Sequence, residues 1–365
     1  MMARSLRVAP EYIDKVRSAL GRNGYHSQQS LAARMELSLS TVKSFLTGKA
    51  VDYLNFVELT KKLGLNWQDI AYQEPETQPP KPQPTNGEAS PFITGAPITQ
   101  PRYFFGREKE LKRLFNLLKR HPLQNAAIIG KKRSGKTSLL HYLKNISTTP
   151  AEQLRHSQKS DWLLHPENYR WIFVDLQDAR MQSREGLLKY ILESMKMQVP
   201  TPCDLDDFMD VVSDNLHSPT VILLDEISVG LQRCPELDDS FWESLRSLAT
   251  NHTGGNLAFV LATPESPIEL AHNTGHSSPF FNIFGYIAYL GALTEREARE
   301  LIASSPIPFT DEDVESILTQ SCCWPLLLQI LCRERLFNLE EGENNDNWRE
   351  EGLRQMKPFA HLLDS

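Results

Sequence analysis

Apolar runs that alternate with amphipathic stretches occupy the middle of the chain. The runs are AAIIG at 126–130, WIFVDL at 171–176, VILLDE at 221–226, LAFVLAT at 257–263 and YIAYLGAL at 286–293. Near-continuous apolar runs of this length predict strands of a parallel sheet that is buried on both faces. The segments 137–146, 184–197 and 240–250 between them predict the crossover helices of a doubly wound α/β sheet.

After the last apolar run the pattern becomes wholly helical. The segments TEREARELI, DEDVESILTQ and PLLLQILCRERLF place apolar residues at helical spacing. We therefore expect an α/β core over residues 102–293 and a small helical lid over residues 294–365.

The front of the chain has a different pattern, that of a short helix, a turn and a second helix. Residues 27–49 read SQQSLAARMELSLSTVKSFLTGK. The positions expected to face inward are Leu31, Ala32, Leu37, Val42, Phe45 and Leu46, and Gly48 is placed to end the second helix. With helices at 10–20 and 53–63 and the segment LNWQDI, this pattern resembles a lambda-repressor-like helix-turn-helix bundle over residues 1–73.

A proline-rich segment separates the two regions. Residues 74–101 hold eight prolines and almost no apolar periodicity. We expect them to form an extended, semi-rigid linker because such a sequence packs no core of its own. A docking ligand for another protein domain is the alternative interpretation.

The composition narrows the class of protein. Hydrophobic residues make up 40% of the 365 residues and charged residues 23%, the balance of an ordinary globular protein with two or three domains. No run approaches the roughly 20 apolar residues of a membrane span, and the start lacks a signal-peptide core, so we expect a cytoplasmic protein without membrane contact. The five cysteines lack C-x-x-C spacing and are interpreted as reduced thiols.

The charge is unevenly distributed. The net charge is -7, yet residues 1–73 carry 10 Lys and Arg against 6 Asp and Glu. Any contact with nucleic acid is therefore expected at the front of the chain.

A glycine-rich segment joins the first apolar run to the helix that follows it. Residues 130–137 read GKKRSGKT and fit the pattern G-x-x-x-x-G-K-[ST] between a strand and a helix. In that setting backbone N–H groups surround phosphates, Lys136 reaches the β and γ phosphates, and Thr137 places a hydroxyl on Mg²⁺. The pattern predicts ATP and Mg²⁺ as cofactors, against a merely structural turn. The predicted nucleotide contacts here are Gly130, Lys131, Arg133, Ser134, Gly135, Lys136, Thr137 and Ser138.

Two acids end the run VILLDE, at the carboxyl edge of the sheet where ligands of open α/β folds bind. Asp225 is predicted to hold Mg²⁺ together with Thr137, and Glu226 to polarise the attacking water as a general base. A solvated turn after a strand is the alternative. Thr263, at the end of LAFVLAT, is a further catalytic candidate that orients the γ phosphate or its water, or else caps the turn before Pro264.

Together, FFGREKELKRL at 104–114, GKKRSGKT, VILLDE, LAFVLAT and LGALTEREARELI at 291–302 resemble AAA-type P-loop ATPases of the STAND and archaeal-ATPase branch, over roughly residues 102–335. The resemblance implies that Phe105, Gly106 and Arg107 contact the nucleotide at its adenine end. It also implies that ATP binding and slow hydrolysis act as a switch, often coupled to formation of a homo-oligomer.

The chain departs from AAA motor proteins in two places. Residues 247–295 contain no Lys or Arg, which excludes a motor-style arginine finger there and predicts slow hydrolysis. Arg246 is the nearest candidate. In the lid, SCCWPLLLQ at 321–329 resembles the Gly-x-Pro segment of STAND lids with Cys323 in place of the glycine. Pro325 is then an adenine-side contact, or Trp324 and Pro325 are ordinary core residues.

The front bundle has two interpretations. If it reads duplex DNA, the second helix enters the major groove with Ser40, Thr41, Lys43 and Ser44, and the phosphate backbone meets Arg34, Lys43 and Lys49. If it does not, it contacts another protein, as helical bundles at the front of STAND proteins do. The absence of arginine on the second helix keeps both interpretations open.

Three functions follow from these elements. The first is a regulatory ATPase switch whose nucleotide state controls self-association and the action of the front bundle. The second is a DNA-loading ATPase of the transposition target-selection type, which needs a basic surface such as Arg107, Lys109, Lys112 and Arg113. The third is a transcriptional regulator whose ATPase has decayed, against which the intact Lys136, Asp225 and Glu226 count.

Overall fold

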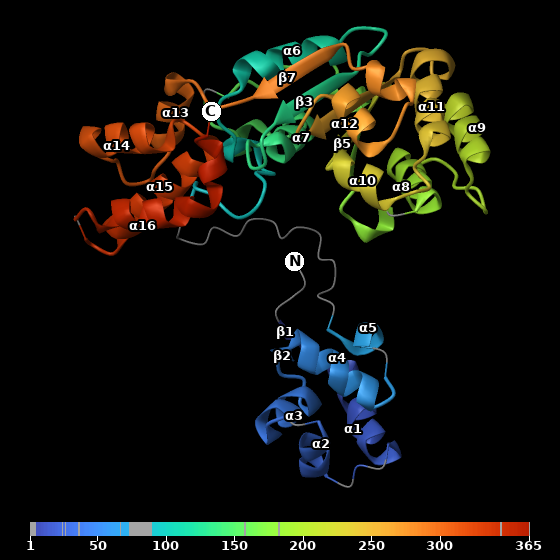
Figure 1. The fold of residues 1–365 in the computed structure, drawn as a ribbon, viewed down its shortest axis with the longest axis vertical. Coiled ribbons are helices and arrows are strands. Elements are labelled where there is room, and N and C mark those ends of the chain that lie inside the picture. Colours follow the sequence, from blue (N-terminus) through green and yellow to red (C-terminus); the bar gives the residue numbers. More distant parts are fainter. Residues whose placement is uncertain are drawn as a thin grey trace. The chain divides into compact units, whose positions relative to one another are not determined.

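The chain divides into two compact units, residues 1–88 and 89–365 (Figure 1). The computed structural model describes residues 5–72 and 90–364, apart from residues 24, 26, 36, 66, 157, 182 and 344. Each unit is considered by itself below.

The first unit is a small helical bundle. Its helices are α1 (Ile13–Arg22), α2 (Gln28–Arg34), α3 (Leu39–Leu46), α4 (Tyr53–Lys62) and α5 (Trp67–Ile70), and a short antiparallel pair joins β1 (Ser5–Leu6) to β2 (Val51–Asp52). The sequence did not predict this strand pair. Ser27 and Ser38 cap α2 and α3 with their hydroxyl oxygens, which accept backbone N–H groups of the first turns. Burial is confirmed for Leu31, Ala32, Val42, Phe45 and Leu46, and Leu37 is partly buried.

The second unit is built on a five-stranded parallel sheet, which confirms the predicted α/β fold class. The strands are β3 (Ala126–Gly130), β4 (Arg170–Asp175), β5 (Thr220–Asp225), β6 (Leu257–Thr263) and β7 (Tyr286–Leu290), in the spatial order β4-β5-β6-β3-β7. Because β6 lies between β3 and β5, the end of β6 separates the glycine-rich loop from the paired acids.

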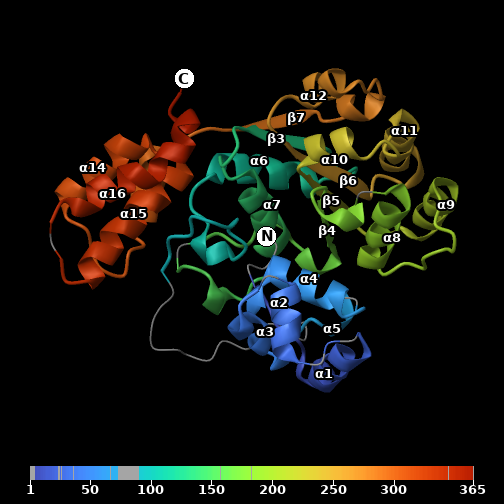
Figure 2. The same ribbon diagram turned by 60° about the horizontal axis from the view of Figure 1, so that its bottom comes forward.

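Helices cover both faces of this sheet, as Figure 2 shows. One face packs on α6 (Glu108–Leu118) and α7 (Lys136–Asn145), and Val221 and Leu223 of β5 point into that core. The alternate residues Ile222 and Leu224 point into the other core. That core is formed with α8 (Arg184–Met195), α9 (Leu205–Asn215), α10 (Ile227–Arg233), α11 (Asp239–Ser247) and α12 (Pro267–Thr274). A strand buried on both faces explains the unbroken apolar runs.

Four helices form the lid beyond the sheet, at the left of Figure 1. They are α13 (Glu295–Ile302), α14 (Asp311–Ser321), α15 (Pro325–Glu340) and α16 (Asn347–Met356). Thr294 and Thr310 cap α13 and α14 in capping boxes. Inside the lid, Arg335 donates from Nε to Asp313 Oδ2 at 2.8 Å, with both side chains 5% exposed. The lid therefore has its own core and a buried ion pair that fixes α14 against α15.

The proline-rich segment is not a spacer along its whole length. Residues 74–89 lie outside the described residues, but residues 90–101 pack on the second unit. Phe92 is 4% exposed within the lid core, and Ile93 N donates to Gln329 Oε1 at 2.5 Å. Ile98 N donates to Ser138 Oγ at 3.0 Å. The linker prediction is wrong for residues 90–101. Phe92, Ile93 and Ile98 pack on the second unit, and the extended backbone donates hydrogen bonds to side chains of that unit.

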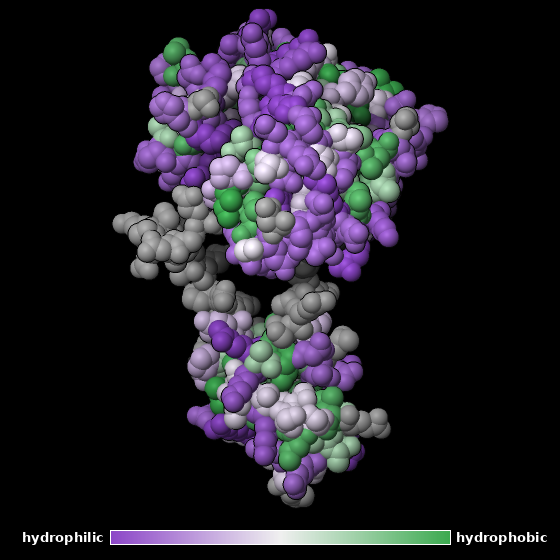
Figure 3. Space-filling view, turned by 90° about the vertical axis from the view of Figure 1, so that its left-hand side faces the viewer, coloured by the Kyte–Doolittle hydropathy of each residue, from purple (hydrophilic) through white to green (hydrophobic). Residues whose placement is uncertain are grey.

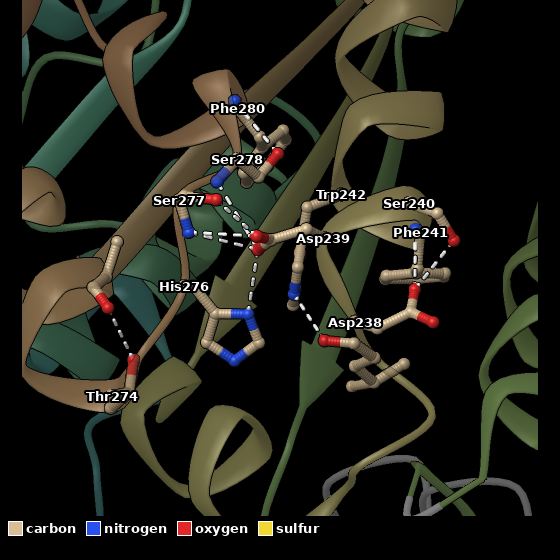
Figure 4. A network of polar contacts seen from close by, with 12 residues as sticks. Asp238, Asp239, Ser240, Phe241, Trp242, Thr274, His276, Ser277, Ser278 and Phe280 are labelled. Atoms are coloured by element: carbon tan, nitrogen blue, oxygen red, sulfur yellow. Dashed lines mark hydrogen bonds and ion pairs between the residues drawn. The ribbon is translucent and has the colours of Figure 1, made fainter.

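Polar contacts fix α11 to the segment that follows α12 (Figure 4). The Asp239 carboxylate accepts the Ser277 hydroxyl at 2.6 Å and the backbone N–H groups of Ser277 and Ser278 at 3.0 and 3.3 Å. His276 Nδ1 lies 3.1 Å from the same carboxylate. The hydrogen bond from Ser277 and the others lower the pKa of Asp239. In a catalytic triad the histidine lies between the acid and the serine. Here Ser277 and His276 both contact Asp239 directly, so the group holds two segments together and is not arranged as a triad.

On the side of the second unit that carries the lid, the described residues form small hydrophobic areas that are separated by hydrophilic ones (Figure 3). Within the described residues, no helix has both the length and the apolar character needed to cross a membrane.

Candidate nucleotide-binding site

The glycine-rich loop forms a tight turn between β3 and α7. A Cβ atom on Gly130 would stand 2.4 Å from Ser134 Oγ and 2.9 Å from the Leu290 carbonyl oxygen, so no larger residue fits there. Gly135 precedes α7 with φ +99°, a left-handed conformation that glycine adopts at no steric cost. The loop therefore keeps its backbone close to the helix N-terminus, where phosphate groups bind.

Lys136 lies across this loop. Its Nζ donates to the carbonyl oxygens of Gly130 at 2.8 Å and Lys131 at 3.2 Å. Burial lowers the pKa of Lys136, while the nearby Glu226 and Asp225 act in the opposite direction. A half-buried ammonium group held at the mouth of the loop is suited to bind phosphate oxygens.

Asp225 ends β5 and is 3% exposed. Burial raises its pKa to about 6, a hydrogen bond from Thr137 opposes the rise, and the charges of Glu226 and Asp175 add to it. Asp175 ends the neighbouring strand β4 directly beside Asp225. The sequence analysis did not single out Asp175, although it is the next-to-last residue of WIFVDL, as Asp225 is of VILLDE. Three acids thus gather at one edge of the sheet.

Glu226 leaves the strand and adopts φ 51° immediately before α10. This left-handed conformation is costly for a residue with a side chain, and such strain concentrates at functional sites. The expected strand VILLDE therefore ends one residue early, and the turn gives Glu226 a direction different from that of Asp225. Both side chains line the same cavity.

Thr263 ends β6 beside Ile129 of β3. Its hydroxyl is buried without a hydrogen-bond partner in the described part of the chain, and so is that of Ser134. Buried polar groups normally have partners, so two free hydroxyls flanking the glycine-rich loop fit a site that is completed by a ligand. Thr263 itself does not line the cavity, whereas its neighbours Ala262 and Pro264 do.

One cavity of about 790 Å³ joins these groups, a volume typical of small-molecule sites. Its polar end holds Lys136, Thr137, Asp225 and Glu226. Its apolar end lies between the extended segment 93–98 and the lid. The lining residues at that end include Ile93, Pro97, Ile98, Phe104, Phe105, Leu293, Leu301, Pro325 and Leu326. Of the remaining predicted contacts, Arg133, Ser134, Gly135 and Ser138 also line the cavity.

Arg107 lies on the cavity wall, so its role as a nucleotide contact stays a prediction, and its side chain also holds the backbone around it. Although it lines the cavity, its guanidinium donates to the carbonyl oxygens of Gly291 at 2.5 Å, Ala292 at 3.4 Å and Ser134 at 3.5 Å. The side chain is 5% exposed, and burial lowers its pKa. Arg107 therefore braces the start of the lid against the loop. Arg107 was also predicted to belong to a basic DNA-binding surface. That prediction is wrong for this residue, because a buried guanidinium cannot contact DNA.

Gly106, also predicted to contact the nucleotide, is not among the described residues that line the cavity. Its φ is +73°, and a Cβ there would stand 2.9 Å from Leu293. Gly106 makes the turn that allows Phe105 and Arg107 to reach their positions.

Lys131 and Gly130 are likewise not on the cavity wall. Lys131 Nζ donates to the carbonyl oxygens of His361, at 3.1 Å, and Asp364. His361 Nε2 in turn lies 3.1 Å from the Lys132 carbonyl oxygen. The side chain of Lys131 binds carbonyl groups of the C-terminal segment, so the structure places it away from the cavity, and its nucleotide contact stays a prediction.

The lid residue Pro325 lines the cavity, as expected, and Trp324 packs against the lid core. Cys322 and Cys323 precede them with φ 45° and 59°. Cys323, predicted to stand in place of the glycine of a Gly-x-Pro segment, thus adopts the conformation that glycine prefers. Its carbonyl oxygen accepts Leu293 N at 2.9 Å, which ties the lid to the end of the sheet.

The oxygen groups at the polar end fit Mg²⁺. In the described residues no group of three or more His, Cys, Asp or Glu side chains forms a metal cage. Magnesium is usually bound by one or two carboxylates together with substrate phosphates and water, which matches Asp225 beside Thr137.

Two arginines are relevant to catalysis. Arg233, at the end of α10, lines the cavity near Glu226, and the sequence analysis missed it because no motif marks it. Arg246 does not line the cavity of its own chain. Its Nε atom is buried without a partner in the described part of the chain.

In the first unit, the cationic DNA candidates Arg34, Lys43 and Lys49 are exposed. Ser40 Oγ and Thr41 Oγ1 lie 2.7 and 2.8 Å from the Ser38 hydroxyl, so part of their capacity serves the cap of α3. Ser44 is half-buried on the same helix.

Comparisons with known proteins place the fold. No protein-family model matches the chain, and no curated protein matches it significantly. Solved structures do match. A Walker-type ATPase of Pyrococcus abyssi has a TM-score of 0.52 at 16% identity, over 74% of this chain and 77% of that one. The ORC2 protein of Aeropyrum pernix, in ADPNP–ADP complexes, has a TM-score of 0.53 at 14% identity, over 72% and 71%. The chain therefore has an α/β P-loop ATPase fold like that of these two structures.

Proposed function

We propose that this protein is a cytoplasmic, ATP-binding regulatory switch of the STAND type that hydrolyses ATP slowly. The observation that carries the proposal is the meeting of Lys136 and Thr137 from the loop with Asp225 and Glu226 from β5 on one cavity. Phosphate-binding, metal-binding and proton-accepting groups are then all within one site.

The residues divide the work of hydrolysis. Lys136 and the backbone N–H groups of the loop bind the phosphates, and Glu226 accepts a proton from the attacking water. Thr137 and Asp225 would hold Mg²⁺, which neutralises charge on the phosphate oxygens when bound. Ser134 lines the cavity with a free hydroxyl, whereas the free hydroxyl of Thr263 lies behind the cavity wall formed by Ala262 and Pro264.

Hydrolysis is expected to be slow because the cavity has few cations besides those of the loop. Apart from Lys132, Arg133 and Lys136, the described cationic lining consists of Arg107, which is held by carbonyl groups, and the exposed Arg233. An arginine supplied to the transferring phosphate accelerates comparable reactions about 10³- to 10⁵-fold. Arg233 of the same chain is the candidate, and self-association would offer another.

The switch rests on the lid. Pro325, Leu326 and Gln329 of α15 line the cavity opposite the loop, so a bound nucleotide would contact lid and core at once. We propose that this contact favours a homo-oligomer that gathers the front bundles on duplex DNA or on another protein. The alternatives are a DNA-loading ATPase and a transcriptional regulator. The buried Arg107 weakens the first, since it removes one cation from the proposed basic surface.

Calorimetric titration with ATP–Mg²⁺ tests the proposal. Lys136→Ala is expected to lose affinity about ten- to hundredfold, because a charge-assisted contact is worth about 1.5–3 kcal/mol. Lys144→Ala, on the same helix α7 but off the cavity, is the matched control and should bind as the wild type does. Equal affinity of both variants would refute the assignment.

A further inference from the structure

A second cavity of about 820 Å³ lies beside the nucleotide cavity. Phe104 and Phe105 line both cavities and so form a shared wall between them. The other walls come from α6, from the segment between α7 and β4, and from lid helix α13. The volume is again typical of a small-molecule site.

Flat aromatic rings form much of the core side of this cavity. Phe115 and Trp162 stack with centroids 5.1 Å apart and planes at 13°. Phe104 and Tyr142 lie 4.5 Å apart. Phe115, Tyr142 and Phe104 are buried behind the wall, so the rings give the cavity a flat apolar side against which the planar part of a ligand can pack.

The charges of the cavity do not balance. Lys159 pairs with Asp161 at 2.9 Å, and Arg296 pairs with Glu108 at 3.0 Å and Glu300 at 2.8 Å. Every acid that lines the cavity is thereby paired. The remaining lining cations are Lys112, Lys119 and Arg155, and none of them forms an ion pair with a described residue. Three cations directed at one concave surface favour an anion.

Arg155 links this cavity to the shared wall. Its guanidinium stands 3.9 Å from the centre of the Phe105 ring and donates to the Arg102 carbonyl oxygen. Burial lowers its pKa. An anion in the cavity would neutralise a partly desolvated cation that contacts a ring and a carbonyl group and forms no ion pair with a described residue.

We propose that this second cavity binds a small anionic effector with a planar aromatic part, such as an aromatic carboxylate, sulfonate or phosphate. No residue of the phosphate-binding loop lines this cavity, so effector binding is independent of the proposed function, whereas its coupling to the nucleotide rests on that function.

Occupancy of the second cavity is coupled to the nucleotide. Arg296 and Glu300 on α13 form its lid wall, and Phe105 belongs to both cavities. A ligand that bridges α6 and α13 changes the cost of moving the lid, and linkage requires the nucleotide and the effector to change each other's affinity equally. The second site gives the switch an input that is separate from ATP.

The test is a fluorescence titration of the full chain with 8-anilinonaphthalene-1-sulfonate, an aromatic sulfonate. Saturable binding with one site per chain is expected. Asn116→Trp fills the cavity from α6 and should weaken binding about tenfold or more. Lys112→Glu should weaken it about three- to tenfold, whereas Lys109→Glu makes the same charge change on the same helix outside the cavity and should leave it unchanged.

Controls separate this site from the nucleotide site. Binding should persist in Lys136→Ala, and the affinity in wild type should change when ATP–Mg²⁺ is added. Circular dichroism melting checks that each variant is folded. If Asn116→Trp is unfolded, the comparison of Lys112→Glu with Lys109→Glu tests the proposal. The proposal is overturned if no saturable binding occurs, if Lys112→Glu and Lys109→Glu bind alike, or if Lys136→Ala abolishes binding.

Discussion

Burial changes the pKa values of individual residues at the edge of the sheet. Asp225 is nearly inaccessible, and its pKa of about 6 stands above the ordinary 3.8 because the charged form loses hydration. Lys136 shows the complementary effect, since burial lowers its pKa. Each group is destabilised in its charged form, and a phosphate–metal ligand would restore the lost interactions of both.

This displacement makes stability depend on pH. The folded protein holds the Asp225 proton more tightly than the unfolded chain does. Protonation of Asp225 therefore adds fully to the free energy of unfolding below about pH 3.8, and this addition is lost as the pH rises through about 6. Relative to Asp225→Asn, the wild type should lose about 1.4 kcal/mol of unfolding free energy between about pH 5 and pH 8. Urea denaturation in EDTA without nucleotide measures this. If the difference in unfolding free energy between wild type and Asp225→Asn does not change with pH, the pKa of Asp225 is not raised.

Glu226 allows a test of catalysis apart from binding. Glu226→Gln keeps the shape of the side chain but accepts no proton, so turnover should fall at least about hundredfold while ATP affinity is retained. Phosphate release and a binding titration measure the two effects. Glu193→Gln on α8, exposed and away from the cavity, should behave as wild type. Unchanged turnover in Glu226→Gln would show that another group is the base.

At the scale of elements, two terminal segments hold the loop and the lid together. The segment 90–98 joins α15 to α7 through Gln329 and Ser138. The segment Lys357–Leu362 with the residues after it contacts the loop through Lys131 and His361. Neither segment is part of the sheet, yet both contact the residues around the phosphate position.

Breaking the second of these contacts should loosen the C-terminal segment. Lys131→Ala removes two hydrogen bonds at the surface, together worth about 1 kcal/mol, so local opening should become about fivefold more frequent. Hydrogen exchange of residues 357–364 measures this opening. Lys109→Ala is the control for loss of an exposed lysine. Equal protection in both variants would mean that the contact contributes nothing.

At the scale of the whole molecule, two compact units serve different chemistry. The second carries the cavity, and the first carries exposed cations on and around α2 and α3. A bundle with so few cations is expected to bind DNA weakly by itself, at about 10⁻⁴ to 10⁻⁶ M. Assembly through the second unit would raise the effective concentration of bundles without any new contact.

This arrangement predicts that ATP strengthens DNA binding by the full chain. Lys43→Glu should weaken it, whereas Lys61→Glu on α4 makes the same charge change away from α3 and should have a smaller effect. Fluorescence anisotropy of a labelled duplex at several salt concentrations measures both. If the full chain with ATP binds no DNA at low salt, or Lys43→Glu and Lys61→Glu bind alike, the bundle is a protein-interaction module.

The local features of this protein were determined by its sequence. Eight consecutive residues, 130–137, set the loop, because its glycines, lysine and threonine act within one turn. Apolar runs predicted the five described strands of the sheet, most clearly the inner strands β3, β5 and β6, which are buried on both faces and therefore mostly apolar. Serine and threonine caps likewise belong to single helix ends.

Contacts between distant residues were decided only by the tertiary structure. Arg107 is held by Gly291, 184 residues away, and Ile93 donates to Gln329, 236 residues away. Asp175 lies beside Asp225 because β4 and β5 pair in register. No local pattern encodes such neighbours, since they depend on strand order and on which surfaces remain open after the core has packed. Contacts between distant residues also hold the Lys131 side chain away from the nucleotide cavity. Such contacts likewise make part of the proline-rich segment a wall of that cavity.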